Sequence, residues 1–574
     1  MILSASRSGN LSRGACSAAA FRAAAVAVFL VFLVPAVPAT AAVSPKPDYF
    51  AAARSIELLG EVYQEVAGNY VDSLDVSELM YAAIDGMLAE LDPYTSFLDE
   101  AQSEELDELT AGKYAGIGVT IGFLSGEVYI LSVIEGFAAS QAGLRVGDRI
   151  HAVEGVPVGN RSLDEIRTRI KGASGTTVRL GIQRDGSSTI RDYTLRREEV
   201  RVSTVTYAGL FDGFGYVEMN SFGQHSADEL AAAIKTVQSE AAAGRKPLKG
   251  IILDLRGNPG GLLNAAVDVT GLFVAKGSRV VSTRGRELDS EEIYITKNPP
   301  LVAALPLAVL INGESASASE IVAAAIQEHD RGVILGEGSF GKGLVQSVFT
   351  LPYDHSLKLT TAKYYTPSGR LIQKPLERKE GNRKVIGEAA GRDSAKAFFT
   401  VNRRKVYSGG GIRPDIAVSG PRLSDYEQTL RQKGMFFRFA SRYRSAHPAF
   451  SGQESGLPSL LGEFNAFLES EKFSYRSQPQ RELDSLRQLV AKEGGGGRNA
   501  CAGALESLER DLAVLARQRV LQDSTRIVSE LGQEILRHYD EKAARRAAIS
   551  SDPVVAQAIG ILGNTGKYRE LLSP

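Results

Sequence analysis

Hydrophobic positions near the start of the chain recur at steps of three and four, as in Ile56, Leu59 and Tyr63. This spacing places apolar side chains on one face of a helix. Pro93 would end the helix before it, because proline lacks the amide hydrogen that a helix interior needs. We therefore predict a helical N-terminal region over residues 44–111.

Between residues 112 and 197, short β-like runs alternate with glycines. The runs that predict strands are 117–121, 128–133, 177–184 and 190–195. Ser162, with Glu165 three residues later, is a capping signature for a helix over residues 162–171. We expect these elements to form one compact domain.

From residue 198 to residue 420, apolar runs alternate with helical patterns. The predicted strands are 215–219, 250–255 and 307–311, and the predicted helices are 227–241, 262–273 and 318–327. Continuous apolar strands that alternate with helices are typical of a layered α/β core. We predict such a core for this part of the chain.

Residues 421–574 return to a helical pattern, in which Leu505, Leu508 and Leu512 are three or four residues apart. Four glycines at 494–497 predict a break within it. These helices carry no recognisable chemistry, so we expect them to serve packing or a dimer surface. A chain of 574 residues is too long for one hydrophobic core, and the fold class we predict is multidomain α/β with helical terminal regions.

Residues 1–41 have the order of a secretory signal peptide. Arginines precede an apolar run at 23–34, and the small residues Ala39, Thr40 and Ala41 follow it. The run is shorter than the roughly 20 residues that span a bilayer, so we expect cleavage after Ala41. The protein would then be extracytoplasmic, most simply in a bacterial periplasm. An uncleaved segment would instead keep it at the membrane.

Composition excludes several classes of function. The 66 basic and 67 acidic residues nearly balance, which gives no general reason to bind nucleic acid. Removal of the signal would leave Cys501 as the single cysteine, so no internal disulfide is expected. The six histidines form no zinc-binding pattern, and we predict no metal and no cofactor.

Three serines, Ser315, Ser317 and Ser319, lie between the predicted strand 307–311 and the predicted helix 318–327. A hydroxyl at such a junction has backbone N–H groups and the positive end of the helix dipole close by, as acyl transfer requires. An ordinary N-cap of small residues would explain the same sequence. The segment alone does not choose between these interpretations or among the serines.

Lys342 lies between two glycines further along the chain, and its amine could act as the general base for a serine nucleophile. A serine hydroxyl needs a group that takes its proton, and lysine can do so when burial lowers its pKa. The phosphate-loop pattern that begins at Gly336 ends in Gly343 instead of Ser or Thr, which disfavours nucleotide binding. No Ser-x-x-Lys or G-x-S-x-G pattern surrounds the serines, and His329 and His355 are expected to be structural.

Short motifs follow one another in a fixed order between residues 70 and 416. They are Leu91-Asp92-Pro93-Tyr94-Thr95-Ser96-Phe97-Leu98, Gly116-Ile117-Gly118-Val119, Ala142-Gly143-Leu144 with Gly147-Asp148, Asp254-Leu255-Arg256-Gly257-Asn258-Pro259-Gly260-Gly261, Ser315 to Ile321, Ser339-Phe340-Gly341-Lys342-Gly343-x-Val345-Gln346, Tyr365-Thr366-Pro367-Ser368-Gly369-Arg370, and Gly410-Gly411-Ile412-Arg413-Pro414-Asp415-Ile416. Together they resemble the carboxyl-terminal processing peptidases, also called tail-specific proteases. An ordered set is far more specific than any one motif.

The resemblance implies roles for particular residues. Ser317 would be the nucleophile, Lys342 its general base and Gln346 the residue that orients the lysine. The acidic residue eleven positions after the serine in some members corresponds to Glu328, which we expect to be structural.

The resemblance also implies an oxyanion hole and a fold. The implied donors are the backbone N–H of Ala318 and one N–H from Gly260 or Gly261, with the choice between the glycines open. The implied fold is an α/β core of crotonase-like ββα units over residues 198–420, preceded by an inserted PDZ domain over residues 112–197.

The predicted PDZ domain offers a site for a peptide terminus. Gly116-Ile117-Gly118-Val119 can form a turn of free N–H groups that holds a carboxylate while the peptide adds as a strand. A free, apolar C-terminus is therefore the expected recognition element. The sequence leaves open whether this domain activates or inhibits the core.

The predicted function is a serine endopeptidase that cleaves the tails of extracytoplasmic proteins through an acyl-enzyme. The alternative is a catalytically inactive PDZ scaffold that binds unfolded tails, which the complete set of Ser317, Lys342 and Gln346 disfavours. The partners we consider are substrates with exposed C-termini, a second copy bound through the helical regions, and a lipoprotein or another regulator bound at the PDZ domain.

Overall fold

The computed structural model describes residues 2–3, 49–245, 247–287, 290–375, 377–380, 383–386, 396–420, 423–448, 457–493 and 497–574. Apart from the short strand β1 (Ile2–Leu3), the predicted signal segment lies outside these residues, and so do residues 494–496 of the glycine run. Within the described ranges, no helix is both long enough and apolar enough to cross a membrane.

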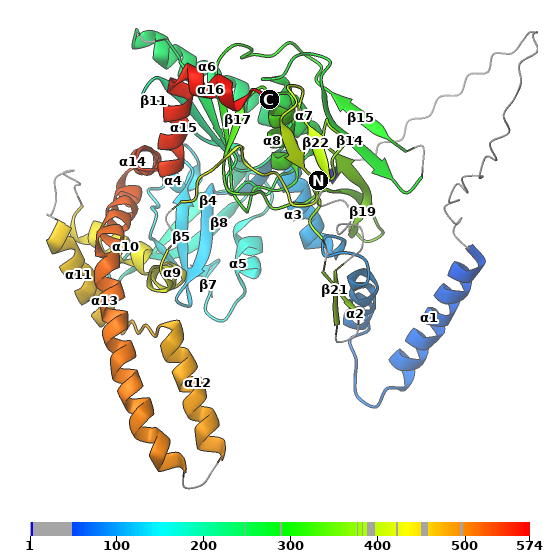
Figure 1. Ribbon diagram of the computed structural model, residues 1–574. Helices are drawn as coiled ribbons and strands as arrows, with labels where there is room; N and C mark the ends of the chain where they lie inside the picture. Colours follow the sequence, from blue (N-terminus) through cyan, green and yellow to red (C-terminus); the bar gives the residue numbers. More distant parts are fainter. Residues whose placement is uncertain are drawn as a thin grey trace, which may run out of the picture.

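The N-terminal region holds three helices, as the apolar spacing predicts, and one short strand. They are α1 (Tyr49–Asn69), α2 (Val76–Ala89), β2 (Ser96–Leu98) and α3 (Glu100–Ala111). The expected apolar face of α1 is not buried, since Ile56 is 72% and Leu59 is 52% exposed, and α1 stands apart from the rest of the molecule (Figure 1). The strand β2 was not predicted, because it forms only by pairing with a distant strand, β19 (Ser356–Tyr365).

Residues 113–201 form a separate domain that a two-stranded ladder joins to the rest. The ladder pairs β3 (Lys113–Gly116) with β10 (Glu198–Arg201). The remaining elements are β4 (Val119–Leu124), β5 (Glu127–Val133), α4 (Ala138–Gln141), β6 (Arg149–Val153), β7 (Val156–Pro157), α5 (Leu163–Ile170), β8 (Thr177–Gln183) and β9 (Ile190–Arg196). The strand order β4-β5-β6-β8-β9 leaves β4 at an edge of the sheet.

Two local predictions can be compared in this domain. The cap of α5 is confirmed, because Ser162 and Glu165 exchange hydrogen bonds of 3.0 and 3.2 Å. The strand predicted over 117–121 instead begins at Val119, because Gly118 has a φ of +77° and turns the chain.

The core domain is built on a six-stranded sheet of order β11-β12-β13-β16-β17-β24. Its strands are β11 (Val205–Phe211), β12 (Phe214–Met219), β13 (Gly250–Asp254), β16 (Leu307–Ile311), β17 (Val333–Gly336) and β24 (Ile416–Ala417). All neighbours are parallel except β11 and β12. The three strands predicted from apolar runs agree with β12, β13 and β16 within one residue.

Helices cover both faces of this sheet (Figure 1). One face packs on α6 (Ser226–Ala243), α7 (Leu263–Gly271) and α8 (Ala318–Glu328), through strand residues such as Leu253 and Val309. The alternate residues Ile252 and Leu310 face the last helices of the chain, α14 (Glu541–Ser550) and α15 (Pro553–Gly563), with Tyr568 of α16 (Thr565–Leu571). The end of the C-terminal region therefore completes the layered α/β core.

A second sheet lies beside this core. It contains β14 (Arg279–Gly285), β15 (Glu292–Ile295), β18 (Leu344–Thr350) and β19, in the order β1-β18-β19-β14-β15, with β2 also paired to β19. Two hairpins follow, β20 (Glu377–Glu380) with β21 (Arg383–Ile386) and β22 (Ala397–Phe399) with β23 (Lys405–Tyr407). The second sheet thus joins the N-terminal region to the segment that follows Lys342.

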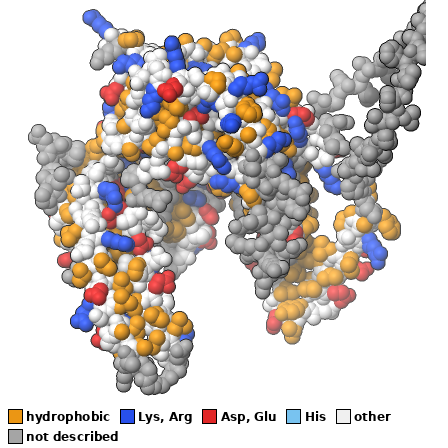
Figure 2. Space-filling view, in the orientation of Figure 1, with side chains coloured by type: hydrophobic (Ala, Val, Ile, Leu, Met, Phe, Trp, Pro, Cys, Tyr) orange, Lys and Arg blue, Asp and Glu red, His pale blue; other side chains and the backbone are white. Residues whose placement is uncertain are grey.

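Other C-terminal helices form an apolar cluster of their own. They are α9 (Asp425–Gln432), α10 (Met435–Ala446), α11 (Leu457–Ser470) and α13 (Gly497–Tyr539). Helix α12 (Gln478–Glu493) lies outside this cluster and packs along α13. Helix α10 contacts the 113–201 domain, where Ser441 Oγ donates to Gly147 O at 3.3 Å. The outer part of the α12–α13 hairpin projects away from the molecule, and hydrophobic surface follows it in Figure 2.

A buried ion pair contributes to the stability of the core, and substitution of one of its partners tests this contribution. Arg370 Nε and Glu328 Oε1 lie 2.5 Å apart with both side chains 1% exposed, so removal of either partner leaves an unpaired buried charge. We expect Arg370→Ala to lower the free energy of unfolding by about 3–5 kcal/mol, measured by urea denaturation. The matched control is Arg201→Ala, since Arg201 is 86% exposed. Equal effects of the two changes would contradict this account.

Candidate active site

Ser317 lies in a strained turn between β16 and α8. It is 1% exposed and has φ 56° and ψ −112°, a conformation that costs free energy in a residue with a side chain. The strain is maintained by the turn around it, because Ser315 N donates to Asn312 O at 3.0 Å and Ala316 N donates to Asn258 O at 3.0 Å. The turn presents the Ser317 side chain at the start of the helix.

Hydrogen bonding separates the three serines of this turn. Ser315 Oγ donates to Leu255 O at 2.8 Å, and Ser319 Oγ donates to Asn258 O at 2.9 Å. Ser317 Oγ is buried and has no hydrogen-bond partner among the residues that the structure describes. Buried hydroxyls are usually paired, so an unpaired one needs an explanation, and a catalytic role is one such explanation. The structure therefore distinguishes the serine that the resemblance selects from its two neighbours.

Lys342 is half-buried just before β18. Its Nζ donates to Gln346 Oε1 at 2.7 Å and lies 4.6 Å from the centre of the Tyr94 ring. Burial, with a smaller effect of Lys358, lowers the pKa of Lys342 from 10.5 to about 8, while Asp92 and Glu320 act in the opposite direction. A substantial share of this amine is therefore neutral near pH 8 and able to accept a proton.

The Glu320 carboxylate connects the serine turn to the lysine loop. Its Oε2 accepts from Ser317 N at 2.8 Å and from Lys342 N at 2.9 Å, and its Oε1 accepts from Ser339 Oγ at 2.5 Å and from Gly341 N at 2.7 Å. The side chain is fully buried, and this burial raises its pKa to about 7 against the effect of the four hydrogen bonds. The two amides thus meet at one oxygen atom.

Tyr364 makes a second connection between the same segments, since its Oη donates to Ser317 O at 3.3 Å and to Lys342 O. No hydrogen bond joins the two side chains, because Lys342 Nζ donates to Gln346 and Ser317 Oγ has no partner in the described part of the chain. The structure thus brings the predicted pair into one site, with the serine and lysine held separately.

Gly260, one of the two glycines predicted as an oxyanion donor, lies against the serine turn. A side-chain carbon at Gly260 would be 2.8 Å from Ser317 Cβ and 2.9 Å from Ala318 N, so only glycine allows this approach. Gly260 N already donates to Asn258 Oδ1 at 2.9 Å. Among the hydrogen bonds of the described residues, none is donated by the N–H of Ala318 or Gly261. Of the two predicted glycines, Gly261 is therefore the one whose N–H has no acceptor among the described residues.

The N-terminal region contributes residues to the site that the sequence analysis did not assign. Asp92 Oδ2 accepts from Thr95 Oγ1 at 3.0 Å, Thr95 Oγ1 accepts from Thr360 N at 3.2 Å, and Gln346 Nε2 donates to Thr360 Oγ1 at 3.4 Å. With Tyr94 beside Lys342, these contacts extend from the N-terminal segment to the lysine. The sequence did point to these residues, because Asp92, Tyr94 and Thr95 belong to the first of the ordered motifs.

Glu328 and the histidines have structural contacts. Glu328 binds Arg370 and accepts from Ser368 N at 2.6 Å. His329 contacts Arg279 O at 2.7 Å through Nε2, and the His355 ring lies 5.1 Å from the Phe97 ring.

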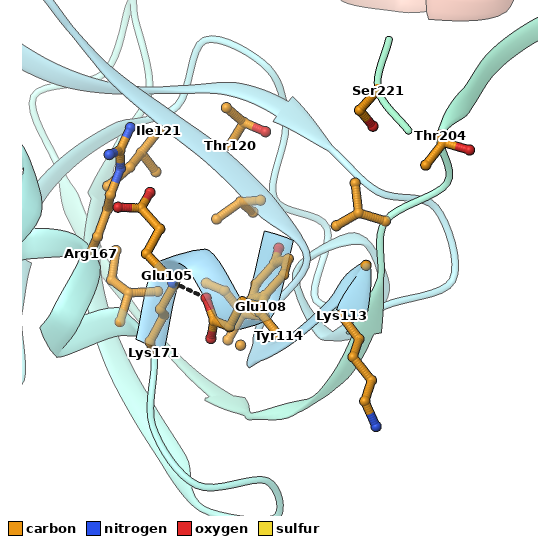
Figure 3. Close-up of a pocket in the computed structure, with 16 residues that line it drawn as sticks. Glu105, Glu108, Lys113, Tyr114, Thr120, Ile121, Arg167, Lys171, Thr204 and Ser221 are labelled. Atoms are coloured by element: carbon orange, nitrogen blue, oxygen red, sulfur yellow. Dashed lines mark hydrogen bonds and ion pairs between the residues drawn. The ribbon is translucent and has the colours of Figure 1, made fainter. Parts of the chain in front are cut away.

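The residues predicted to bind a peptide carboxylate lie at a groove of the 113–201 domain. Gly116, Ile117 and Val119 line a cavity of about 360 Å³ between β4 and α5, shown in Figure 3. Gly118 sits in the same turn with its φ of +77°. The outer edge of β4, which has no partner strand among the described residues, borders this groove.

Comparisons with known proteins agree with this architecture. Residues 213–378 match the model of peptidase family S41, residues 129–184 that of the PDZ domain, residues 39–102 that of the activating protease CtpB N-terminal domain, and residues 426–562 that of a probable PDZ-protease C-terminal helical domain. The carboxy-terminal-processing protease of Bartonella bacilliformis is 38% identical over 320 residues, which cover 56% of this chain and 73% of that protein.

The carboxy-terminal processing protease CtpA of Bacillus subtilis is 32% identical over 437 residues, covering 76% of this chain and 90% of that protein. A solved structure titled photosystem II D1 C-terminal processing protease has 29% sequence identity and a TM-score of 0.32, covering 58% of this chain and 92% of that one. The fold and its site define a serine-type peptidase with a PDZ domain. The chain belongs to peptidase family S41, among the carboxy-terminal processing proteases. The predicted family, fold class and enzyme class are thereby confirmed.

Glu320→Gln tests the connection between the serine turn and the lysine loop. The glutamine amide has one NH2 group in place of an acceptor oxygen, and this group would face the N–H donors of the two segments. The serine turn and the lysine loop should therefore separate, and kcat should fall about 100-fold. Steady-state kinetics with a peptide substrate measure the effect. Glu314→Gln, an exposed change in the same turn, is the control. An unchanged kcat in Glu320→Gln would contradict the connecting role.

Tyr94→Leu tests the aromatic contact with Lys342. The ring face stabilises an ammonium group, so its loss should lower kcat about tenfold, whereas Tyr94→Phe should retain most activity because it keeps the ring. Comparison of kcat and KM for the two variants checks this. Equal losses in both variants would instead point to the Tyr94 hydroxyl.

Proposed function

We propose that the protein cleaves the carboxyl-terminal tails of extracytoplasmic proteins as a Ser317/Lys342 endopeptidase. The observation that carries the proposal is the unpaired, buried Ser317 hydroxyl at the start of α8, in a turn tied through Glu320 to the loop of a lysine with a lowered pKa. An inactive scaffold would have no use for a strained serine with a free hydroxyl.

The reaction begins when neutral Lys342 accepts the proton of Ser317 Oγ. For this step the lysine side chain swings from Gln346 toward the serine. Ser317 Oγ then bonds to the carbonyl carbon of the substrate, and the carbonyl oxygen becomes an oxyanion. The N–H groups of Ala318 and Gly261 would stabilise that charge, helped by the positive end of the α8 dipole.

The protonated Lys342 donates its proton to the departing amine, and the peptide bond breaks to leave an acyl-enzyme. Neutral Lys342 next takes a proton from water, whose oxygen attacks the ester carbonyl. The ester bond breaks, and the proton returns to Ser317. Gln346 holds the lysine amine between these transfers, and the Tyr94 ring lies beside it when it is charged.

The PDZ domain would supply the substrate. A free carboxylate would bind the N–H groups of the Gly116-Ile117-Gly118-Val119 turn while the peptide extends β4. The apolar side chains of Ile117, Ile121 and Ile170 line the groove, which supports an apolar tail as the preferred sequence.

Substitution of either member of the pair tests the chemistry. Ser317→Ala removes the nucleophile and Lys342→Ala removes the base, so each should lower cleavage of a peptide with a free apolar C-terminus to background. Mass spectrometry of the products provides the measurement. The exposed changes Ser239→Ala and Lys235→Ala on α6 are the controls. Undiminished cleavage by either active-site variant would refute the mechanism, and binding without cleavage by the parent would support the scaffold.

The pH dependence of kcat/KM follows from the pKa of Lys342. The group is a base only when neutral, and its pKa is lowered to about 8, so activity should rise with pH and level off above about pH 8. At pH 7 about a tenth of the maximum should remain, whereas an ordinary lysine would leave almost none. A pH profile in buffers of constant ionic strength measures this. A rise centred near pH 10 would contradict the lowered pKa.

A further inference from the structure

The peptide groove of the PDZ domain is closed on a third side by the protein itself. Its first two walls are β4 and α5, as Figure 3 shows. Glu105 and Glu108 of α3, with Tyr114 of β3, form the third wall. Glu105 and Glu108 precede the domain in the chain, and Tyr114 lies in its first strand, so the segment that enters the PDZ domain also borders its binding site.

An ion pair crosses this groove. Lys171 Nζ, directly after α5, donates to Glu108 Oε2 of α3 (Figure 3). The Lys171 side chain is 36% exposed and that of Glu108 is 20% exposed, so both charges are partly withdrawn from water. Because the pair is partly shielded from water, salt weakens the attraction between its two charges less than it would weaken a pair on the surface.

The lysine lies close to the turn expected to hold a carboxylate. Lys171 Nζ is 5.8 Å from the centre of the Tyr114 ring. That ring packs on the first glycine of the turn, because a carbon placed on Gly116 would lie 2.6 Å from Tyr114 Cε2. The Glu108 carboxylate is therefore held in the same cavity as the Gly116-Ile117-Gly118-Val119 turn.

We propose that Lys171 is the counter-ion for the terminal carboxylate of the substrate, and that Glu108 occupies this role until a substrate binds. The inference rests on the proposed recognition of free C-termini by this domain. A peptide carboxylate can replace Glu108 without leaving Lys171 unpaired, because one carboxylate exchanges for another. Glu108 would move to solvent, which it can reach because it is already partly exposed. The α3 segment would then be released from α5.

The neighbouring cations do not fit this role equally well. Lys113 also lines the cavity, but its amine points away from it in Figure 3 and pairs with Glu199 at 3.0 Å. Arg167 is occupied by Asp164 on its own helix at 3.1 Å. Both lysines line the cavity, but only Lys171 of the two pairs with a residue of the third wall. Lys113 therefore serves as the matched control for Lys171.

The test uses full-length Ser317→Ala protein, which cannot turn substrate over under the proposed mechanism. Two fluorescent peptides with the same apolar sequence are compared by anisotropy, one ending in a free carboxylate and one in a carboxamide. We expect the parent to prefer the acid by about tenfold or more. Lys171→Met should reduce this preference at least about fivefold, whereas Lys171→Arg and Lys113→Met should keep it. Glu108→Gln should tighten binding of the acid severalfold by removing its competitor.

Thermal melts of each variant serve as the control for folding. A Lys171→Met protein that weakens both peptides equally, or that keeps the full preference for the acid, would overturn the proposal and leave the proposed function standing. Loss of the preference in Lys113→Met would overturn it as well. Failure of the parent to bind either peptide would overturn the recognition of C-termini itself, and this proposal with it.

Discussion

The candidate active site depends on one buried carboxylate. Glu320 lies in the first turn of α8 and accepts hydrogen bonds from both the serine turn and the lysine loop, which are separated by the whole helix and by β17. No cation neutralises it within hydrogen-bond distance in the described part of the chain, so N–H groups, a hydroxyl and the helix dipole must compensate for its burial. Four donors directed at one carboxylate leave the loop of Lys342 little freedom to move away from Ser317.

The layered core supports this carboxylate from both sides. The α6–α8 layer contains the helix that bears Glu320, and the last helices of the chain cover the opposite face of the sheet. Those last helices also contact the turn that leads to Gly260 and Gly261, because Arg256 bonds to Asp552 at 2.8 Å and to Asp254 at 2.6 Å. The peptidase core therefore includes residues far beyond the segment that matches the peptidase family model.

The N-terminal region connects the site to the substrate-binding domain. Its Asp92–Thr95 segment contacts Lys342 and the strands behind it, and α3 continues from there to the wall of the PDZ groove. The same stretch of chain therefore borders both the surroundings of Lys342 and the PDZ groove.

The sequence by itself determined the elements and the candidate residues. Continuous apolar runs and helical spacing are local patterns, so the strand at 307–311 and the cap at Ser162 were predictable, and the ordered motifs identified the family. Only the tertiary structure decided which serine hydroxyl lacks a partner among the described residues, because Ser315 and Ser319 donate to carbonyls about 60 residues away. It also decided that β2 forms, that Tyr94 lies beside Lys342, and that the serine and lysine side chains are held apart. Such contacts join distant segments, and no local pattern in the sequence records them.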